Sequence, residues 1–268
     1  MKKRKTVVAA SLWLTGWMIC SIWATLFTSS DFQLSHALLS PQLTWENWTG
    51  HDAFGRNVLH SVLRGSFISL SFAFTAVLIS ISCSTLFGIS TVFSPDWLQR
   101  TAKIILEFFI GIPGLVLALA VAAVNGPGWS TLLLALILGV LPSLARLVQS
   151  RTRELIMEGY TQAARALGAS KVHITRRHLL RSIAPLIAAK LPQVFAHCLL
   201  AEATLTFLGV GAPLGNETWG SLLAQGRDYL LEAPQIAWFA GLPLTLTLLS
   251  VQTLGDTLGR NQNASFRG

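Results

Sequence analysis

The chain has 268 residues, of which 52% are hydrophobic and only 12% are charged, and its mean hydropathy is +0.55. Soluble domains carry about 25% charged residues, so this composition excludes an ordinary soluble domain. Apolar runs of about 20 residues recur along the chain, and runs of that length are typical of membrane-spanning helices. The composition therefore predicts an all-α integral membrane protein.

Six apolar segments are long enough to cross a bilayer. They are residues 7–28, 67–93, 104–124, 129–149, 186–210 and 237–258. The fifth is the least apolar because it contains Lys190, His197 and Glu202. The first follows MKKRK, as in a signal peptide, but it is long and no A-x-A cleavage site follows it. We therefore expect a retained membrane anchor.

Basic residues are distributed unevenly around these segments. If the N-terminus lies in the cytoplasm, only Arg56, Arg64 and Arg227 of the 20 Lys and Arg residues fall on the outer side. This is the positive-inside bias of membrane proteins, so we expect both termini to be cytoplasmic. The same bias accounts for the formal net charge of +8, and no nucleic-acid partner is needed to explain it.

The expected organisation has three parts. Residues 1–65 hold a cytoplasmic tail, the first transmembrane helix and an external segment. Residues 66–260 hold a core of five helices with a cytoplasmic loop at 150–185. Residues 261–268 form a second cytoplasmic tail.

The sequence contains no motif for catalysis or for a bound cofactor. It lacks a G-x-x-x-x-G-K-[ST] phosphate loop, an H-E-x-x-H pair and a nucleophile elbow. Cys20, Cys83 and Cys198 lie in predicted spans without a C-x-x-C pair. We interpret them as small buried apolar residues rather than as disulfides or metal ligands. We therefore expect a chain that is not an enzyme and binds no cofactor or metal.

A polar, basic segment lies between the fourth and fifth spans. It covers residues 159–182 and reads GYTQAARALGASKVHITRRHLLRS. In its first half, residues at i, i+3, i+4 and i+7 predict one face of a short helix. These residues are Tyr160, Ala163, Ala164 and Leu167. Gly168 fits the end of this helix, because glycine tolerates the left-handed conformation.

The second half of this segment predicts another helix. Ser170 can cap it, and it would run from about Lys171 to Arg181, with Pro185 marking its end. The alanines on the first helix allow close approach of another surface. That surface is either the chain's own helices or a partner, and the residues alone leave both alternatives open.

Gln162-Ala163-Ala164, followed by Gly168, resembles the cytoplasmic coupling loop of ABC-importer permeases. The family form begins Glu-Ala-Ala, with a glycine four residues after the second alanine, and its helix inserts into a groove on an ATPase subunit. Gln in place of Glu loses one charge, which removes a possible ion pair to that subunit. The resemblance assigns ATPase coupling to Tyr160, Gln162, Ala163, Ala164, Leu167 and Gly168.

Two further blocks narrow the family. Residues 50–70, GHDAFGRNVLHSVLRGSFISL, are similar to a GTDxxGRDVxSRxxxGxRxSL signature. That signature belongs to one of the two permease subunits of dipeptide, oligopeptide and nickel importers. His51 stands for its Thr and Asn57 for its second Asp. Residues 202–220 resemble the later EAxLSFLGLG…SWG block. The external signature residues are Gly50, Asp52, Gly55, Arg56, Arg64 and Gly65.

The resemblance implies a type I importer permease fold with six transmembrane helices and a cytoplasmic coupling-helix loop, in a bacterial cytoplasmic (inner) membrane. It implies half of a translocation pore for peptides, or for nickel or metal chelates, delivered by a periplasmic or extracellular binding protein. The implied partners are a homologous second permease subunit in a heterodimer, two ATPase subunits that hold ATP and Mg, the solute-binding protein and the lipid bilayer.

Two alternatives of another class stay open at this point. A secondary, ion-coupled transporter would need intramembrane carboxylates and internal repeats, whereas the spans hold one mid-span carboxylate, Glu202, and no repeat. A non-transporting membrane scaffold would not depend on an ATPase.

Glu202 has two interpretations of its own. A carboxylate in a bilayer should face protein or a water-filled cavity. Glu202 therefore lies either on the transport path or subunit interface, or in a paired position that fixes helix packing. His197 is expected to be an interior histidine rather than a metal ligand.

The external segment also allows two interpretations. Its glycines predict tight turns and close approach of the backbone. Asp52 and Arg56 are spaced for an exposed ion pair, which would contribute only about 0.3–0.5 kcal/mol. The segment either faces the solute-binding protein or is a packed turn that contacts no partner.

Three local patterns concern the spans themselves. Ser80 and Ser84 have the small-xxx-small spacing of closely packed membrane helices. Lys103 and Glu107 are spaced for an i, i+4 ion pair. Prolines inside the spans predict kinks; they are Pro113, Pro142, Pro192 and Pro243.

Overall fold

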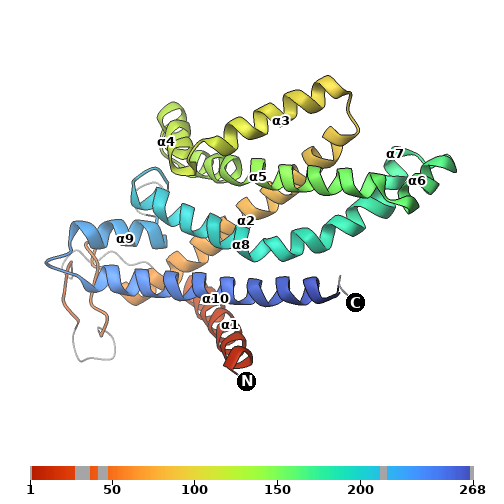
Figure 1. Ribbon diagram of the computed structural model, residues 1–268. Coiled ribbons are helices and arrows are strands. Elements are labelled where there is room, and N and C mark those ends of the chain that lie inside the picture. Colours follow the sequence, from red (N-terminus) through yellow and green to blue (C-terminus); the bar gives the residue numbers. More distant parts are fainter. Residues whose placement is uncertain (1, 28–36, 42–47, 212–215, 266–268) are drawn as a thin grey trace.

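The computed structural model describes residues 2–27, 37–41, 48–211 and 216–265, with side chains described between residues 6 and 257. These residues are almost entirely helical (Figure 1). The helices are α1 (Lys2–Phe27), α2 (Val58–Val92), α3 (Asp96–Gly111), α4 (Gly114–Asn125), α5 (Trp129–Met157), α6 (Gly159–Ala166), α7 (Lys171–Ile174), a π-helical turn (Thr175–Leu179), α8 (Leu180–Phe207), α9 (Trp219–Asp228) and α10 (Gln235–Ser265).

Five to six membrane spans account for the long helices of the described residues. Five helical stretches are long and apolar enough to cross a bilayer, and the bent pair α3 and α4 makes a sixth where the pair counts as one span. These six match the predicted segments in order. The prediction of an all-α membrane protein is confirmed, and its six segments agree with the five to six spans of the structure.

The third span is not the single helix predicted at 104–124. It is broken between α3 and α4, which are bent by 97°. Ile112 is extended, with ψ 127°, and Pro113 follows it. Proline has no N–H to continue the helical bonds, and its ring disfavours helical ψ at the preceding residue. The kink expected at Pro113 is therefore a complete corner.

The helix predicted to end at Pro185 instead continues into the fifth span. The helical path runs from Lys171 to Phe207 through α7, the π-helical turn and α8. Pro185 and Pro192 both lie inside α8. Membrane helices tolerate proline where neighbouring helices compensate, and α10 approaches Pro192 closely. A Cβ at Gly255 would lie 2.8 Å from the Pro192 Cβ.

Three expected boundaries fall inside helices or are displaced. The boundary at residue 65 lies within α2, which begins at Val58. The tail expected from 261 begins inside α10, which continues to Ser265; residues 266–268 lie outside the described part. The loop expected at 150–185 is shorter, because α5 continues to Met157 and the helical path resumes at Lys171.

The molecule has two distinct ends (Figure 1). The short helices α6 and α7 lie at one end, beyond α5 and α8. At the opposite end α9 lies beside the segment that precedes α2. At this second end the α2 backbone passes close to the turn before α9, because a Cβ at Gly65 would lie 3.2 Å from the Thr218 carbonyl carbon.

Small residues let α2 pack closely against α5. Ser80 and Ser84 are buried, as their spacing predicted, and Ser84 Oγ donates to Leu141 O at 3.1 Å. Further along, Gly88 faces α5, where an added Cβ would lie 2.8 Å from Val148 Cβ. The predicted ion pair in α3 is present, since Glu107 Oε1 lies 3.9 Å from Lys103 Nζ. The same oxygen lies 3.8 Å from Arg146 Nη2 of α5.

The contact at Gly88 gives a direct test of this packing. Gly88→Val should lower the free energy of unfolding by about 1–3 kcal/mol, because overpacking displaces neighbouring side chains or backbone. Gly16→Val in α1 is the matched control, since a Cβ there would meet nothing within 4 Å. Thermal unfolding in detergent compares them, and equal melting temperatures for both variants would contradict the α2–α5 packing.

Candidate functional site

The short helix α6 is held away from the bundle by its two ends. At its start, Glu158 is extended, with ψ 140°, and turns the chain out of α5. At its end, Gly168 has φ +84°, in the left-handed region that favours glycine. The Gly168 N–H donates to Arg165 O and the Ala169 N–H to Ala164 O, each at 3.0 Å. The predicted short helix with its glycine end is present.

The predicted face of α6 is largely exposed. Leu167 is 89% exposed and Tyr160 46%; Ala163 is exposed and Ala164 partly buried. Thr161, which is not on that face, is fully buried at 0%. The chain's own helices therefore hold α6 through Thr161 and leave the predicted face open.

Gln162 has a role in the structure that glutamate could not fill. Its Nε2 donates to the Met157 carbonyl at 3.1 Å, and this carbonyl lies in the last turn of α5, where helical partners are missing. A carboxylate only accepts hydrogen bonds. The substitution thus exchanges a charge for a hydrogen bond between α6 and α5, which the sequence analysis did not foresee.

The predicted face of α6 contacts the start of the fifth span at one residue, Tyr160. The Tyr160 ring lies 5.6 Å from the His178 ring, which belongs to the π-helical turn. Ser170 Oγ accepts from the His173 N–H at 3.2 Å, so the predicted N-cap of α7 is present. Within the described residues, α6 is therefore linked to α5 through Gln162 and to the start of the α8 path through Tyr160.

At the opposite end, Asp52 and Arg56 form a buried pair, not the exposed one predicted. Asp52 is 0% and Arg56 7% exposed. Asp52 Oδ2 accepts from Arg56 Nη2 at 2.6 Å and from Nε at 2.7 Å. Its Oδ1 accepts from the backbone N–H of Phe54 and Arg56. A tight turn, rather than a helix, brings the two residues together, with φ +73° at Gly55.

Glu217 extends this pair into a network across the fold. Its Oε1 lies 3.0 Å from Arg56 Nη1 and accepts from Ser61 Oγ at 3.0 Å. Its Oε2 lies 3.8 Å from Arg64 Nε. Two carboxylates and two guanidinium groups thus balance in charge, as burial requires. Glu217 was not predicted from the sequence, because 156 residues separate it from Ser61 and no local pattern links the two.

The ion-pair network of Asp52, Arg56, Arg64 and Glu217 is named the outer network, after the side on which the positive-inside bias predicts it. The signature residues around it position the backbone. Gly50 has φ +74°, and a Cβ there would lie 2.6 Å from Leu39 O. Asn57 caps α2, since its Oδ1 accepts from the N–H of Leu59 at 3.0 Å and of His60 at 3.4 Å. Asn in place of the family Asp therefore keeps the cap. The predicted tight turns and close approach are present at Gly50, Gly55 and Gly65.

Glu202 lies near the last turn of α8, not at mid-span as predicted. It is 0% exposed, and its Oε1 accepts from Thr206 Oγ1 at 3.2 Å. The hydroxyls of Ser69 and Thr218 also face its carboxylate. Three elements, α8, α2 and the turn before α9, meet around this side chain. Of the two interpretations of Glu202, these contacts agree with a paired position that fixes helix packing.

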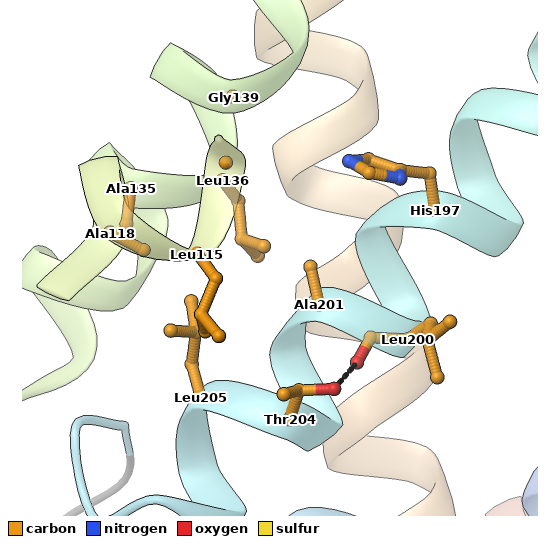
Figure 2. Close-up of a pocket in the computed structure, with 11 residues that line it drawn as sticks. Leu115, Ala118, Ala135, Leu136, Gly139, His197, Leu200, Ala201, Thr204 and Leu205 are labelled. Carbon is orange, nitrogen blue, oxygen red and sulfur yellow. Dashed lines mark hydrogen bonds between the residues drawn. The ribbon is translucent and has the colours of Figure 1, made fainter. Parts of the chain in front are cut away.

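A cavity of about 250 Å³ lies between α4, α5 and α8. Its walls are mostly apolar, with Leu115 from α4 and Leu136 from α5 among them. Figure 2 shows the His197 ring extending from α8 into the space beside α5. His197 is exposed rather than interior, as the sequence had suggested. Glu202 does not line this cavity.

The prediction that all three cysteines are buried is correct for one of them. Cys198 is buried, whereas Cys20 and Cys83 are exposed on the helix surfaces. The cause is that lipid-facing surfaces of a membrane protein are apolar, so a small apolar residue there need not be buried. Within the described part of the chain, no group of three His, Cys, Asp or Glu residues could hold a metal ion.

Comparison with known families decides what this architecture is. Residues 80–268 match the family described as the inner membrane component of binding-protein-dependent transport systems. The chain belongs to this family. It is therefore a permease subunit of an ABC importer, a multi-pass protein of the inner membrane that works with ATPase and binding-protein subunits. The recognition of this family from the sequence motifs is confirmed.

Curated relatives are similar to this permease over most of its length. A protein of Brucella suis biovar 1, provisionally named a peptide transport system permease, is 36% identical over 80% of this chain and 72% of its own. The dipeptide transport permease DppC of Alkalihalophilus pseudofirmus is 30% identical over 96% and 85%. The glutathione transport permease GsiD of Escherichia coli O1:K1 / APEC is 30% identical over 100% and 89%.

A solved structure shares the fold. It is an inward-facing form of the MetNI methionine ABC transporter, with a TM-score of 0.61 over 75% of this permease and 95% of that chain. Only 20% of the aligned residues are identical, so the likeness concerns the fold alone. It confirms the ABC-importer permease fold that the motifs implied.

Proposed function

We propose that this permease forms half of a pore for short peptides, paired with a homologous second permease subunit. Two ATPase subunits, which hold ATP and Mg, dock on α6 and its counterpart, and a solute-binding protein docks at the outer network. Both termini and α6 lie in the cytoplasm. The observation that carries this proposal is the exposed face of α6, held at the end of the molecule opposite the buried charges.

The links of α6 support its role in coupling. Its two neighbours are α5, through the Gln162 amide, and the start of the α8 path, through Tyr160. These same helices, α5 and α8, border the cavity that holds His197. When the ATPases close, they move α6 as a rigid rod, and α5 and α8 shift relative to one another. This shift opens and closes the path at the cavity.

Short peptides are proposed as the solute because of the relatives. Their names refer to peptide, dipeptide and glutathione transport. Nickel and metal chelates, the other class implied by the sequence motifs, are named for none of these three. Nothing in the solute argument depends on the two alternative classes, because membership in the importer family excludes the ion-coupled transporter and the scaffold.

We keep the proposed three-part organisation in outline, with the core beginning at α2 and ending with α10.

Crosslinking from single cysteines tests the docking face. In a chain with Cys20, Cys83 and Cys198 replaced, Ala163→Cys labelled with a maleimide–benzophenone reagent should photocrosslink to an ATPase subunit in native membranes. Thr161→Cys is the control on the same helix, since Thr161 is fully buried and should give no adduct. The proposal fails if both variants crosslink equally, or if purified transporter takes up peptides into proteoliposomes without ATP.

A further inference from the structure

A second, larger cavity lies on another side of the molecule. It has a volume of about 590 Å³ and lies between the last turns of α2 and the beginning of the α7–α8 path. Ile81, Leu86 and Ile89 of α2 form one wall, and Leu180 lies opposite. None of these residues borders the cavity beside His197. The second cavity is therefore separate from the proposed transport path.

The walls of this cavity suit an acyl chain. Leu86 is 74% exposed and Val172, which also lines the cavity, is 66% exposed. These side chains are on helical stretches long and apolar enough to cross the bilayer, where the surrounding solvent is hydrocarbon. Thr85 Oγ1 is buried at the same wall without a hydrogen-bond partner among the described residues. It could bond to the ester group of a lipid.

The rim of the cavity is cationic. Lys171 and Arg176 both line it, at the end of α2 that lies toward α6 and α7 (Figure 1). Lys171 is held in place, because its Nζ donates to Phe93 O at 3.3 Å and lies 5.8 Å from the centre of the Phe93 ring. Between residues 159 and 201 the chain has six Lys and Arg residues and no Asp or Glu. No acidic side chain of that stretch opposes these cations.

We propose that this cavity binds an anionic phospholipid, with one acyl chain against α2 and the phosphate beside Lys171 and Arg176. Basic pockets between membrane helices on the cytoplasmic side favour anionic headgroups. A zwitterionic headgroup carries its own cation and gains less. Assignment to the inner leaflet depends on the orientation proposed above, whereas the existence of the site does not. Lys171 follows Gly168 by three residues, so the lipid would brace the base of α6.

Native mass spectrometry of the assembled transporter tests the site. The purified complex is titrated with phosphatidylglycerol and with phosphatidylethanolamine of the same acyl chains. We expect the wild type to prefer phosphatidylglycerol. Lys171→Gln with Arg176→Gln should weaken phosphatidylglycerol binding about 30-fold, the loss expected for two cations near an anionic headgroup. Binding of phosphatidylethanolamine should not change.

Two further variants distinguish this site from general attraction to basic residues. Arg177→Gln with Arg181→Gln removes the same charge from exposed neighbours that do not line the cavity, and it should bind as the wild type does. Ser90→Trp keeps both cations but fills the cavity, and it should abolish preferential binding even if the double Gln variant does not fold.

Several results would overturn the proposal. Equal binding of the two lipids by the wild type would show that there is no anionic site. Equal losses in both double variants would show a diffuse surface effect. Unchanged binding by Ser90→Trp would place the acyl chain elsewhere, and competition by soluble glycerol phosphate would show a phosphate site rather than a lipid site. Absence of binding in the assembled transporter would mean that a partner subunit covers the cavity.

Discussion

Gly168→Pro is expected to abolish ATP-driven uptake while the permease still inserts into the membrane. Gly168 has φ +84°, which proline cannot adopt because its ring fixes φ near −65°. The substitution also removes the N–H that donates to Arg165 O. Without this turn, α6 is no longer held at its angle to the α7–α8 path. Uptake of a labelled dipeptide by cells, compared with the amount of permease in the membrane, measures the effect.

Gly159→Pro is the matched control for this experiment. Residue 159 is the first of α6, a position that tolerates proline, and Glu158 before it is already extended. Uptake should therefore be retained. Ala164→Trp enlarges the partly buried edge of the same face and should again abolish uptake. Normal uptake by both Gly168→Pro and Ala164→Trp would remove the assignment of α6 as the coupling helix.

Arg56→Met is expected to cause the largest loss of stability, about 3–5 kcal/mol in the free energy of unfolding. Among the described residues, the variant leaves the buried carboxylates of Asp52 and Glu217 with one ion-pair partner, Arg64, at 3.8 Å from Glu217. A buried charge that loses its partner bears the full cost of desolvation. Thermal unfolding in detergent, together with the amount of permease in membranes, should show the loss.

An exposed ion pair supplies the control. Arg151 Nη1 lies 2.7 Å from Glu154 Oε2, a distance similar to that in the outer network, but the two side chains are 33% and 58% exposed. Arg151→Met should change the free energy of unfolding by no more than about 1 kcal/mol. Equal losses of unfolding free energy in Arg56→Met and Arg151→Met would show that burial does not make the outer network more important for stability than an exposed ion pair.

The hydropathy of the sequence was enough to find the membrane spans, because each span must be apolar over the thickness of the bilayer. It was not enough to find their shape. Pro113 indicated a kink, but the 97° corner depends on how α4 packs against α5. Pro185 indicated a helix end, yet the helix continues. Proline is a weak predictor of a helix end in a membrane protein, because neighbouring helices can satisfy the backbone groups that it leaves unpaired.

The site was predictable where its geometry is local. The spacing of Tyr160, Ala163 and Leu167, with Gly168 after them, fixes one helix and its end. The outer network was not predictable, because Glu217, just before α9, meets Arg56, just before α2, only in the folded chain. The spacing of Asp52 and Arg56 predicted that they pair, but their burial, which sets the contribution of the pair to stability, depends on tertiary packing.

The most direct test of the central claim is to determine on which side of the membrane α6 lies. In the cysteine-free chain, Gln162→Cys and Phe54→Cys place single thiols on exposed residues at the two ends. A membrane-impermeant maleimide is applied to sealed cells and then to permeabilised cells. We expect Phe54→Cys to react in sealed cells and Gln162→Cys only after permeabilisation. Reaction of Gln162→Cys in sealed cells would contradict the assignment of α6 as the helix that receives the ATPase.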